Sequence, residues 1–153
     1  MPRYFFDTSA LVKHYHTELG SPKVDLILGE SASEYLIARL TLAEAPSVFA
    51  KKVRMGEIAD VDFYQLRLRF FADVKNRTLT PVRILNAHFE SAGNLIAKHG
   101  KTRQIHTLDA LQLAVALSIQ QPAPIDQFVC ADQRLCDIAA LEGLAIINPE
   151  LNP

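Results

Sequence analysis

Short apolar segments that favour β-strands alternate along this chain with longer segments in which apolar residues recur at helical spacing. Such alternation predicts strand–helix–strand units, in which each helix crosses over the sheet and consecutive strands run parallel. The strand candidates are the run that ends at Phe6 and the segments 34–39, 79–84, 127–131 and 144–147. The sequence therefore predicts an α/β fold: a three-layer sandwich with a central, mostly parallel sheet of about five strands.

Helical segments fill the intervals between these strands. They are expected at residues 9–16, 22–30, 41–54, 57–75, 86–98, 108–119 and 134–141. Thr41 and Glu44 stand three residues apart, as in a capping box that opens a helix. Met55 and Gly56 are expected to join the third and fourth helices into a hairpin, and Pro81 favours an edge position for its strand.

Length and charge bound the class of protein. The chain has 153 residues, the size of one domain with a substantial core, so we expect a single domain over residues 1–153. It has no apolar stretch of the ~20 residues that a membrane span needs, and its N-terminal run lacks the apolar core of a secretory signal. We therefore expect a cytoplasmic protein that does not enter a membrane. A net charge of −1 argues against a surface that binds nucleic acid all over.

Local basic clusters remain compatible with RNA binding. One cluster lies at residues 51–54, and the members of a second are Arg67, Arg69, Lys75 and Arg77. Each cluster forms either a solvated helix face or a contact surface for an RNA backbone. The sequence leaves both interpretations open.

The chain contains two cysteines, Cys130 and Cys136. They are too few and too loosely spaced for a zinc site or a disulfide framework. We expect both to be reduced and partly buried.

Four acidic residues are the strongest candidates for chemistry. Asp7 and Asp132 each stop a predicted strand, and Glu44 and Asp109 each lie in the first turn of a predicted helix. In an open parallel sheet the ligand crevice lies outside the carboxyl ends of the strands, where the strand order reverses. If the strands that precede Asp7 and Asp132 are neighbours, their carboxylates face each other across that crevice.

Each acid taken alone has a simpler explanation. Asp7 is suited to cap the helix that follows it, and the helix macrodipole favours an acid at Glu44 or Asp109. The capping account is weaker for Asp109, because Thr107 is expected to cap that helix and its other residues are almost all apolar. Asp109 and Gln112 lie three residues apart and so form a single polar notch on the helix.

Carboxylates brought together in one crevice repel one another unless a cation lies between them. Hard oxygen ligands of this kind select Mg²⁺ or Mn²⁺. Such ions polarise a phosphodiester and lower the pKa of a bound water that attacks it. An acidic cluster with few nucleophilic side chains therefore suits phosphodiester hydrolysis.

Four fragments contain these acids: FFDTSAL at 5–11, RLTLAE at 39–44, TLDALQLA at 107–114 and FVCADQRL at 128–135. In this order and at these intervals they resemble the PIN domain family, and within it the VapC-type toxins of toxin–antitoxin modules. The resemblance covers essentially the whole chain. It implies metal-binding, catalytic acids at Asp7, Glu44, Asp109 and Asp132, with the hydroxyl of Ser9 beside the first.

The resemblance also implies an activity and partners. The expected activity is that of an endoribonuclease dependent on Mg²⁺ or Mn²⁺, which leaves a 3′-hydroxyl and a 5′-phosphate. The expected partners are an RNA substrate, a small antitoxin protein that holds the toxin inactive, and a second copy of the chain in a homodimer. The apolar hairpin 41–75 is expected to present the antitoxin groove or the dimer face.

Two residues depart from the family pattern. Cys130 occupies a position where a small hydroxyl residue often precedes the last acid, and Pro46 follows Glu44 where helix formers are usual. Cys130 is expected to loosen the hydrogen bonds around the metal ligands, and Pro46 to re-aim Glu44. Arg134, two residues after Asp132, contacts either a substrate phosphate or a surface carboxylate.

Two other functions fit parts of the pattern. One is a catalytically silent PIN-fold module that acts only by binding protein or RNA. The other is a phosphatase of the haloacid dehalogenase type, which also begins with a strand that ends in aspartate. That chemistry needs a second acid two residues after Asp7, where this chain has Ser9.

Overall fold

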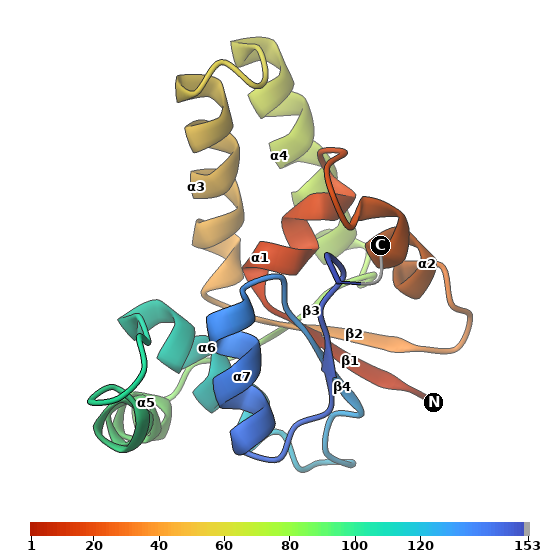
Figure 1. Ribbon diagram of the computed structural model, residues 1–153. Coiled ribbons are helices and arrows are strands. Elements are labelled where there is room, and N and C mark those ends of the chain that lie inside the picture. The colour runs from red at the N-terminus through yellow and green to blue at the C-terminus, as the bar shows by residue number, and fades with distance from the viewer. Residues whose placement is uncertain (152–153) are drawn as a thin grey trace.

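A computed structural model describes residues 1–151 of the protein (Figure 1). Five strands form one sheet in the order β3-β2-β1-β4-β5, and every neighbouring pair is parallel. The strands are β1 (Arg3–Phe6), β2 (Glu34–Ala38), β3 (Thr80–Val82), β4 (Gln127–Val129) and β5 (Ile146–Ile147). The predicted α/β sandwich is confirmed, and β3, which contains Pro81, lies at an edge as expected.

Helices connect the strands and cover both faces of the sheet. They are α1 (Thr8–Leu11), the 3₁₀ helix η1 (Val12–His14), α2 (Ser21–Leu28), α3 (Thr41–Arg54), α4 (Asp60–Lys75), α5 (Asn86–His99), α6 (Thr107–Ser118) and α7 (Gln133–Leu141). Within this part of the chain, no helix combines the length and the hydrophobicity of a bilayer span.

Side chains of the central strand β1 alternate between two cores, one on each face of the sheet. Phe5 packs with α5, α6 and α7 and stacks on Phe128 of β4, with 5.8 Å between the ring centroids. Tyr4 and Phe6 belong to the other core, which α1, α2, α3 and α4 cover. Figure 1 shows these four helices above the sheet and the other three below it. Because successive side chains of a strand point to opposite faces, a strand buried on both faces is apolar throughout.

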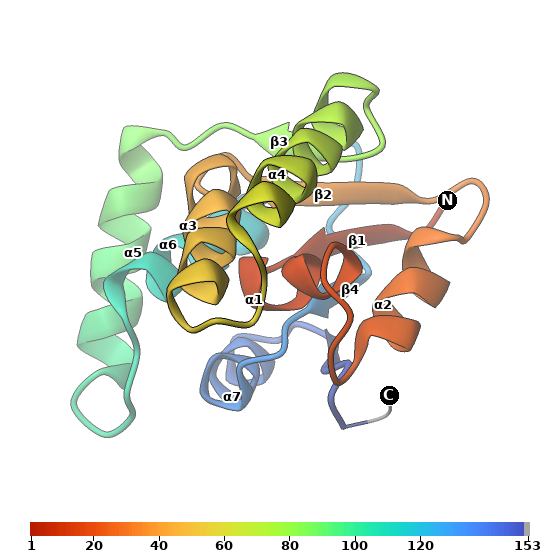
Figure 2. The ribbon, with the colours of Figure 1, turned by 90° about the horizontal axis from the view of Figure 1, so that it is seen from above.

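The strand order reverses between β1 and β4. β1 pairs with β2 on one side and with β4 on the other, and the backbone N–H of Asp7 extends the second ladder by donating to Val129 O at 2.9 Å. In Figure 2 the strands run from right to left, and α1 and α3 begin beside their left ends. The strands that precede Asp7 and Asp132 are therefore neighbours, which is the condition under which their carboxylates were expected to face each other.

Helices α3 and α4 form the predicted hairpin, which projects from the top of the molecule in Figure 1. α3 runs without a break through Pro46. α4 begins at Asp60, later than predicted, because the linker turns at Gly56 with φ +73° and Ala59 is still extended, with φ −79° and ψ 159°. The backbone N–H of Ala59 then donates to the Asp62 carboxylate at 3.0 Å at the start of the helix.

Two predicted helix caps are wrong. Thr41 is the first residue of α3, whose N-cap residue is Leu40, and no side chain caps that helix. Thr107 is likewise the first residue of α6, whose N-cap residue is His106. A cap hydroxyl belongs one position earlier, where it accepts from the orphan N–H groups of the first turn. The Thr41 hydroxyl is therefore available for other contacts.

We expect Phe128→Ala to lower the free energy of unfolding by about 3–5 kcal/mol, because it leaves a cavity and removes the stacking on Phe5. Urea unfolding followed by circular dichroism measures this change. Phe89→Ala is the matched control, since 58% of the Phe89 surface is exposed on α5, and it should cost less than about 1 kcal/mol. Equal losses in both variants would contradict this assignment of the core.

Candidate active site

Asp7 follows β1 at the carboxyl edge of the sheet and is buried, with 4% of its surface exposed. It caps α1: Asp7 Oδ2 accepts from the backbone N–H of Ser9 at 3.1 Å and from the Ser9 hydroxyl at 2.5 Å. Asp7 Oδ1 accepts no hydrogen bond from residues 1–151. The cap therefore uses one carboxylate oxygen and leaves the other for a ligand.

Burial raises the pKa of the Asp7 carboxyl to about 6, because a charge removed from water is disfavoured. The negative charges of Asp109 and Glu44 raise this pKa further, while the two hydrogen bonds from Ser9 lower it. No lysine or arginine within residues 1–151 forms an ion pair with any of the four candidate acids. Asp7 is thus coupled to other carboxylates rather than to a basic partner.

Glu44 lies on the first turn of α3, and side chains from two other segments hold one of its oxygens. Glu44 Oε1 accepts from the Thr8 hydroxyl at 3.0 Å and from Gln112 Nε2 at 2.6 Å. Gln112 Nε2 also lies 3.1 Å from the Thr8 hydroxyl and 3.0 Å from the Thr41 hydroxyl, and these hydroxyls are 2.9 Å apart. The network joins α1, α3 and α6 and fixes the Glu44 side chain.

The network gives Gln112 a contact that the sequence did not predict. Gln112 was expected to form one polar notch with Asp109 on the helix, and its amide donates to Glu44 on α3. Gln112 is fully buried, and its Oε1 atom has no hydrogen-bond partner within residues 1–151. The sequence signal was a single long polar residue in an otherwise apolar helix segment.

Asp109 is electrostatically coupled to the other acids. It lies on the first turn of α6 and is partly buried. Burial raises its pKa most, the charge of Asp132 raises it next, the imidazole of His106 opposes the shift, and Glu44 adds a smaller increase. The pKa of Asp7 also responds to Asp109. Asp109 is therefore coupled to all three of the other acids.

Asp132 follows β4 and caps α7. Asp132 Oδ1 accepts from the backbone N–H groups of Arg134 at 3.0 Å and Leu135 at 3.4 Å. Asp132 Oδ2 accepts no hydrogen bond from the described part of the chain. The two strand-terminating aspartates, Asp7 and Asp132, thus share one design: one oxygen caps a helix and the second has no protein partner.

The donor chemistry of the four acids fits a hard divalent cation, since each keeps an oxygen that no hydrogen bond from residues 1–151 occupies. The geometry is looser: no three or more His, Cys, Asp or Glu side chains in that range lie close enough together to hold a metal ion. The acids share one edge of the sheet, and neighbouring carboxylates raise the pKa of Asp7 and of Asp109, but the four side chains do not converge on one point. Their role as metal ligands stays a prediction.

Ser9 and Cys130 tie Asp7 to the end of β4. The Ser9 hydroxyl accepts from the backbone N–H of Ala131 at 3.1 Å. Cys130 Sγ lies 3.7 Å from the Ser9 hydroxyl and 3.8 Å from Asp7 Oδ2. The Cys130 thiol therefore contacts both Ser9 and Asp7, although Cys130 was expected to loosen the hydrogen bonds around the metal ligands. Cys130 and Cys136 are free, as expected, and are fully rather than partly buried.

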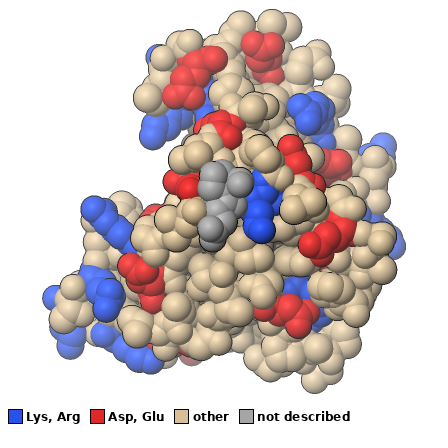
Figure 3. Space-filling model, turned by 45° about the vertical axis from the view of Figure 1, so that its right-hand side comes forward, with Lys and Arg blue, Asp and Glu red and all other residues tan. Residues whose placement is uncertain are grey.

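The basic cluster at residues 51–54 is not a uniformly solvated face. Lys52 is buried and pairs with Glu18 at 3.0 Å and with Glu57 at 3.3 Å, so its charge is neutralised inside the protein. Figure 3 shows acidic and basic side chains interspersed over one face of the molecule, with basic ones most frequent at the lower left. The positive charge available to an RNA backbone is therefore local.

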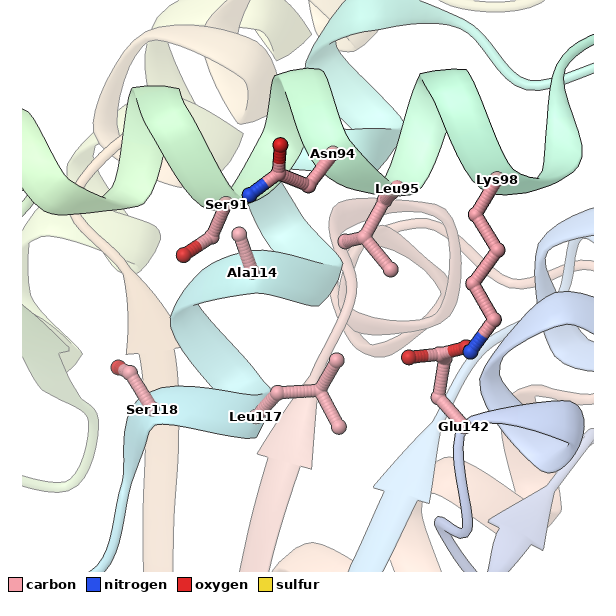
Figure 4. A pocket seen from close by; sticks show the side chains of 8 residues that line it. All are labelled: Ser91, Asn94, Leu95, Lys98, Ala114, Leu117, Ser118 and Glu142. Atoms are coloured by element: carbon pink, nitrogen blue, oxygen red, sulfur yellow. The ribbon is translucent and has the colours of Figure 1, made fainter.

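Two cavities bear on the location of the site. The smaller, of about 20 Å³, is lined by both Asp109 and Asp132. The larger, of about 300 Å³, lies between α5, α6 and the residue after α7 (Figure 4). Its wall carries an ion pair in which Lys98 Nζ lies 2.7 Å from Glu142 Oε2, and it includes none of the four acids. We therefore place the candidate site at the carboxyl edge of the sheet.

The fold and the site define a class of protein: a parallel α/β sandwich with carboxylates gathered at the point where its strand order reverses. The chain belongs to the PIN domain family, whose model matches residues 4–141. The family resemblance inferred from the four sequence fragments is thereby confirmed. No curated protein matches the chain in sequence.

Three solved structures share the fold. VapC20 of Mycobacterium tuberculosis, a sarcin–ricin loop cleaving toxin, is 14% identical with a TM-score of 0.67, over 95% of this chain and 99% of that one. VapBC2 of Rickettsia felis, bound to a promoter DNA fragment, is 19% identical with a TM-score of 0.62, over 95% and 98%. FitAcB of Neisseria gonorrhoeae is 13% identical with a TM-score of 0.59, over 95% and 97%. At these identities the matches establish the fold.

The raised pKa of Asp7 predicts how stability depends on pH without metal. Between the ordinary value of 3.8 and about 6, folded Asp7 keeps a proton that the unfolded chain has released. The free energy of unfolding therefore falls as pH rises through that interval. Asp7→Asn removes this dependence, so its stability relative to the natural protein should grow by up to about 3 kcal/mol from about pH 4 to pH 7.

Urea unfolding in EDTA at several pH values measures this effect. Asp60→Asn is the control, because Asp60 is exposed at the start of α4. If the difference in stability between Asp7→Asn and the natural protein stays constant with pH, the pKa of Asp7 is not raised by burial.

Proposed function

We propose that the protein is an endoribonuclease that hydrolyses RNA phosphodiester bonds with the aid of Mg²⁺ or Mn²⁺. One observation carries the proposal: Asp7, Glu44, Asp109 and Asp132 lie at the switch point of the sheet with no lysine or arginine of residues 1–151 paired to them. Partly buried carboxylates without basic partners are costly unless the site takes up a cation. Membership of the PIN domain family supports the same activity.

The residues of the site have separate tasks in this proposal. The cation would be held by the carboxylate oxygens that have no protein partner. When bound, it polarises the phosphodiester and lowers the pKa of the attacking water. Ser9 orients Asp7 through two hydrogen bonds to the same oxygen. Gln112 and Thr8 orient Glu44 by donating to its Oε1 atom.

We further propose that the protein acts in the cytoplasm as the toxin of a toxin–antitoxin pair. The fold is shared with VapC20, which is described as a toxin that cleaves the sarcin–ricin loop, and with VapBC2 and FitAcB. A small antitoxin protein would bind the chain and block the site, and the active form would be a homodimer.

The α3–α4 hairpin supplies an apolar surface for such a partner. Phe49 and Phe70, two of its aromatic residues, are buried in the core and are therefore not available. Val61, Tyr64 and Leu68 on α4 are exposed by 64%, 60% and 67%. Their spacing of three and four residues places them on one side of the helix. An exposed apolar stripe of this kind is suited to bind a partner helix.

A second function, a catalytically silent PIN-fold binding module, is favoured by one observation. No three acidic, histidine or cysteine side chains within residues 1–151 lie close enough together to hold a metal ion. In a silent module the same acids would have only the capping and packing roles described above. Metal binding and RNA cleavage separate the two functions.

We expect Asp7→Ala and Asp109→Asn each to reduce metal-dependent RNA cleavage at least about 100-fold, because each removes a charge that the cation needs. Cleavage of a labelled RNA in Mn²⁺, with purified protein whose circular dichroism is unchanged, measures the loss. Asp60→Asn, which alters an exposed acid on α4, should cleave at the normal rate.

Calorimetric titration with Mn²⁺ completes the comparison. The natural protein should bind the ion, and the Asp7→Ala and Asp109→Asn proteins should bind it much more weakly. Undiminished cleavage by either variant would remove the nuclease assignment. Absence of both Mn²⁺ binding and cleavage in the natural protein would establish the silent module.

We expect Gln112→Met to lower kcat by about tenfold while changing the free energy of unfolding by no more than about 1.5 kcal/mol. The substitution nearly conserves volume and removes an amide oxygen that has no partner, but it also removes the donor that holds Glu44 Oε1. Gln112→Glu, which places a second carboxylate beside Glu44, should be less stable at neutral pH than at pH 4. Normal kcat in Gln112→Met would show that Glu44 needs no such support.

A further inference from the structure

Arg134 stands beside the candidate site with an unneutralised charge. It is exposed on the first turn of α7, two residues after Asp132. The sequence left open whether it pairs with a surface carboxylate. Within residues 1–151 it pairs with none: its Nη1 group donates to the side-chain carbonyl of Gln104. Gln104 Nε2 in turn lies 2.9 Å from His106 Nε2.

The choice of Gln104 as partner is informative because carboxylates are close by. Arg134, Asp109 and Asp132 line the same cavity of about 20 Å³. A guanidinium beside carboxylates commonly forms a bidentate ion pair, which would cancel the charge of both groups. Here a neutral amide holds the guanidinium instead. The Arg134 guanidinium has five N–H donors. One of them bonds to the described part of the chain, and the others are free for a ligand.

The loop before α6 carries further positive charge. Lys101 and Arg103 lie on the connection from α5 to α6, both exposed, and neither forms an ion pair within residues 1–151. Gln104, which holds Arg134, belongs to this loop. By contrast, Lys13 and Lys52 are buried and paired with glutamates. The charges of Lys101, Arg103 and Arg134 are therefore not neutralised by any carboxylate of residues 1–151.

The geometry points to Arg134, oriented by Gln104, as the residue that binds an RNA phosphate next to the scissile bond. This inference rests on the proposed nuclease function. A cluster of carboxylates repels a polyanion, so an RNA strand needs an adjacent cationic group to bring it to the acids. A planar guanidinium matches the geometry of a phosphate, and Lys101 and Arg103 extend the contact along the strand.

Binding of fluorescein-labelled oligouridylate in EDTA, followed by fluorescence anisotropy at several salt concentrations, tests the inference without cleavage. Arg134→Ala should weaken binding about five- to tenfold and reduce the slope of log affinity against log salt by about 0.7, as expected for one lost contact to a single strand. Arg134→Lys should keep the slope and lose only part of the affinity, because it keeps the charge but not the fork. Gln104→Ala should also keep the slope.

Lys75→Ala is the control for the removal of one positive charge. Lys75 is exposed at the end of α4, next to the amino end of β3 and so away from the carboxyl edge. Lys75 belongs to the second basic cluster, and its position away from the carboxyl edge favours the interpretation of that cluster as a solvated helix face, so this variant should bind oligouridylate as the natural protein does. An unchanged affinity and slope in Arg134→Ala, or equal losses in Lys75→Ala, overturns the inference.

Kinetics in Mn²⁺ separate this inference from the proposed function. Arg134→Ala should raise KM by about the same factor as it weakens binding and leave kcat within about twofold. Cleavage by the natural protein together with normal binding by Arg134→Ala refutes the role of Arg134 and leaves the nuclease assignment intact. Binding that depends on Arg134 without any cleavage refutes the nuclease assignment instead.

Discussion

The structure depends on holding negative charge at one edge of the sheet without neutralising it. Asp7 is almost wholly buried there, and burial and the nearby acids raise its pKa. Its stabilising partners are neutral: the N–H and hydroxyl of Ser9. Glu44 is likewise held by the Thr8 hydroxyl and the Gln112 amide. Neutral donors lower the cost of burying a carboxylate but leave its charge in place, whereas a lysine would cancel it. The carboxyl edge of the sheet therefore keeps the negative charge that the proposed cation would need.

Most of the fold could be predicted from the sequence because the physical signals are local. A strand buried on both faces is apolar throughout, and a helix that covers a sheet repeats its apolar residues at helical spacing, so β1 and α3 were both recognised. Element ends were less predictable. The start of α4 depends on the extended conformation of Ala59, and the pattern of Thr41 and Glu44 looked like a cap. The start of α4 and the cap of α3 were thus decided by backbone angles that the residue pattern does not reveal.

The candidate site likewise has a part that the sequence predicts and a part that it does not. The four acids were found because each follows a strand or begins a helix, and their order along the chain resembles a known family. Ser9, which supports Asp7, was named from the same resemblance, whereas the residues that support Glu44 were not found, because such support depends on distances between segments that the sequence does not give. Gln112 was recognised only as part of a polar notch with Asp109 on the same helix, and its hydrogen bond to Glu44 on α3 was not predicted. Gln104 and Arg134 lie 30 residues apart, and only the fold brings them together.

The position of β1 has a consequence for biosynthesis. β1 precedes the other four strands along the chain and is the central strand of the sheet, and its residue Tyr4 is paired with Gln127. Until β4 has been translated, one side of β1 lacks its hydrogen-bonding neighbour and is exposed to mispairing with other chains. The acids extend from Asp7 to Asp132, so an incomplete nascent chain has no assembled site. The activity proposed above would therefore arise only after the ribosome has translated the chain as far as Asp132.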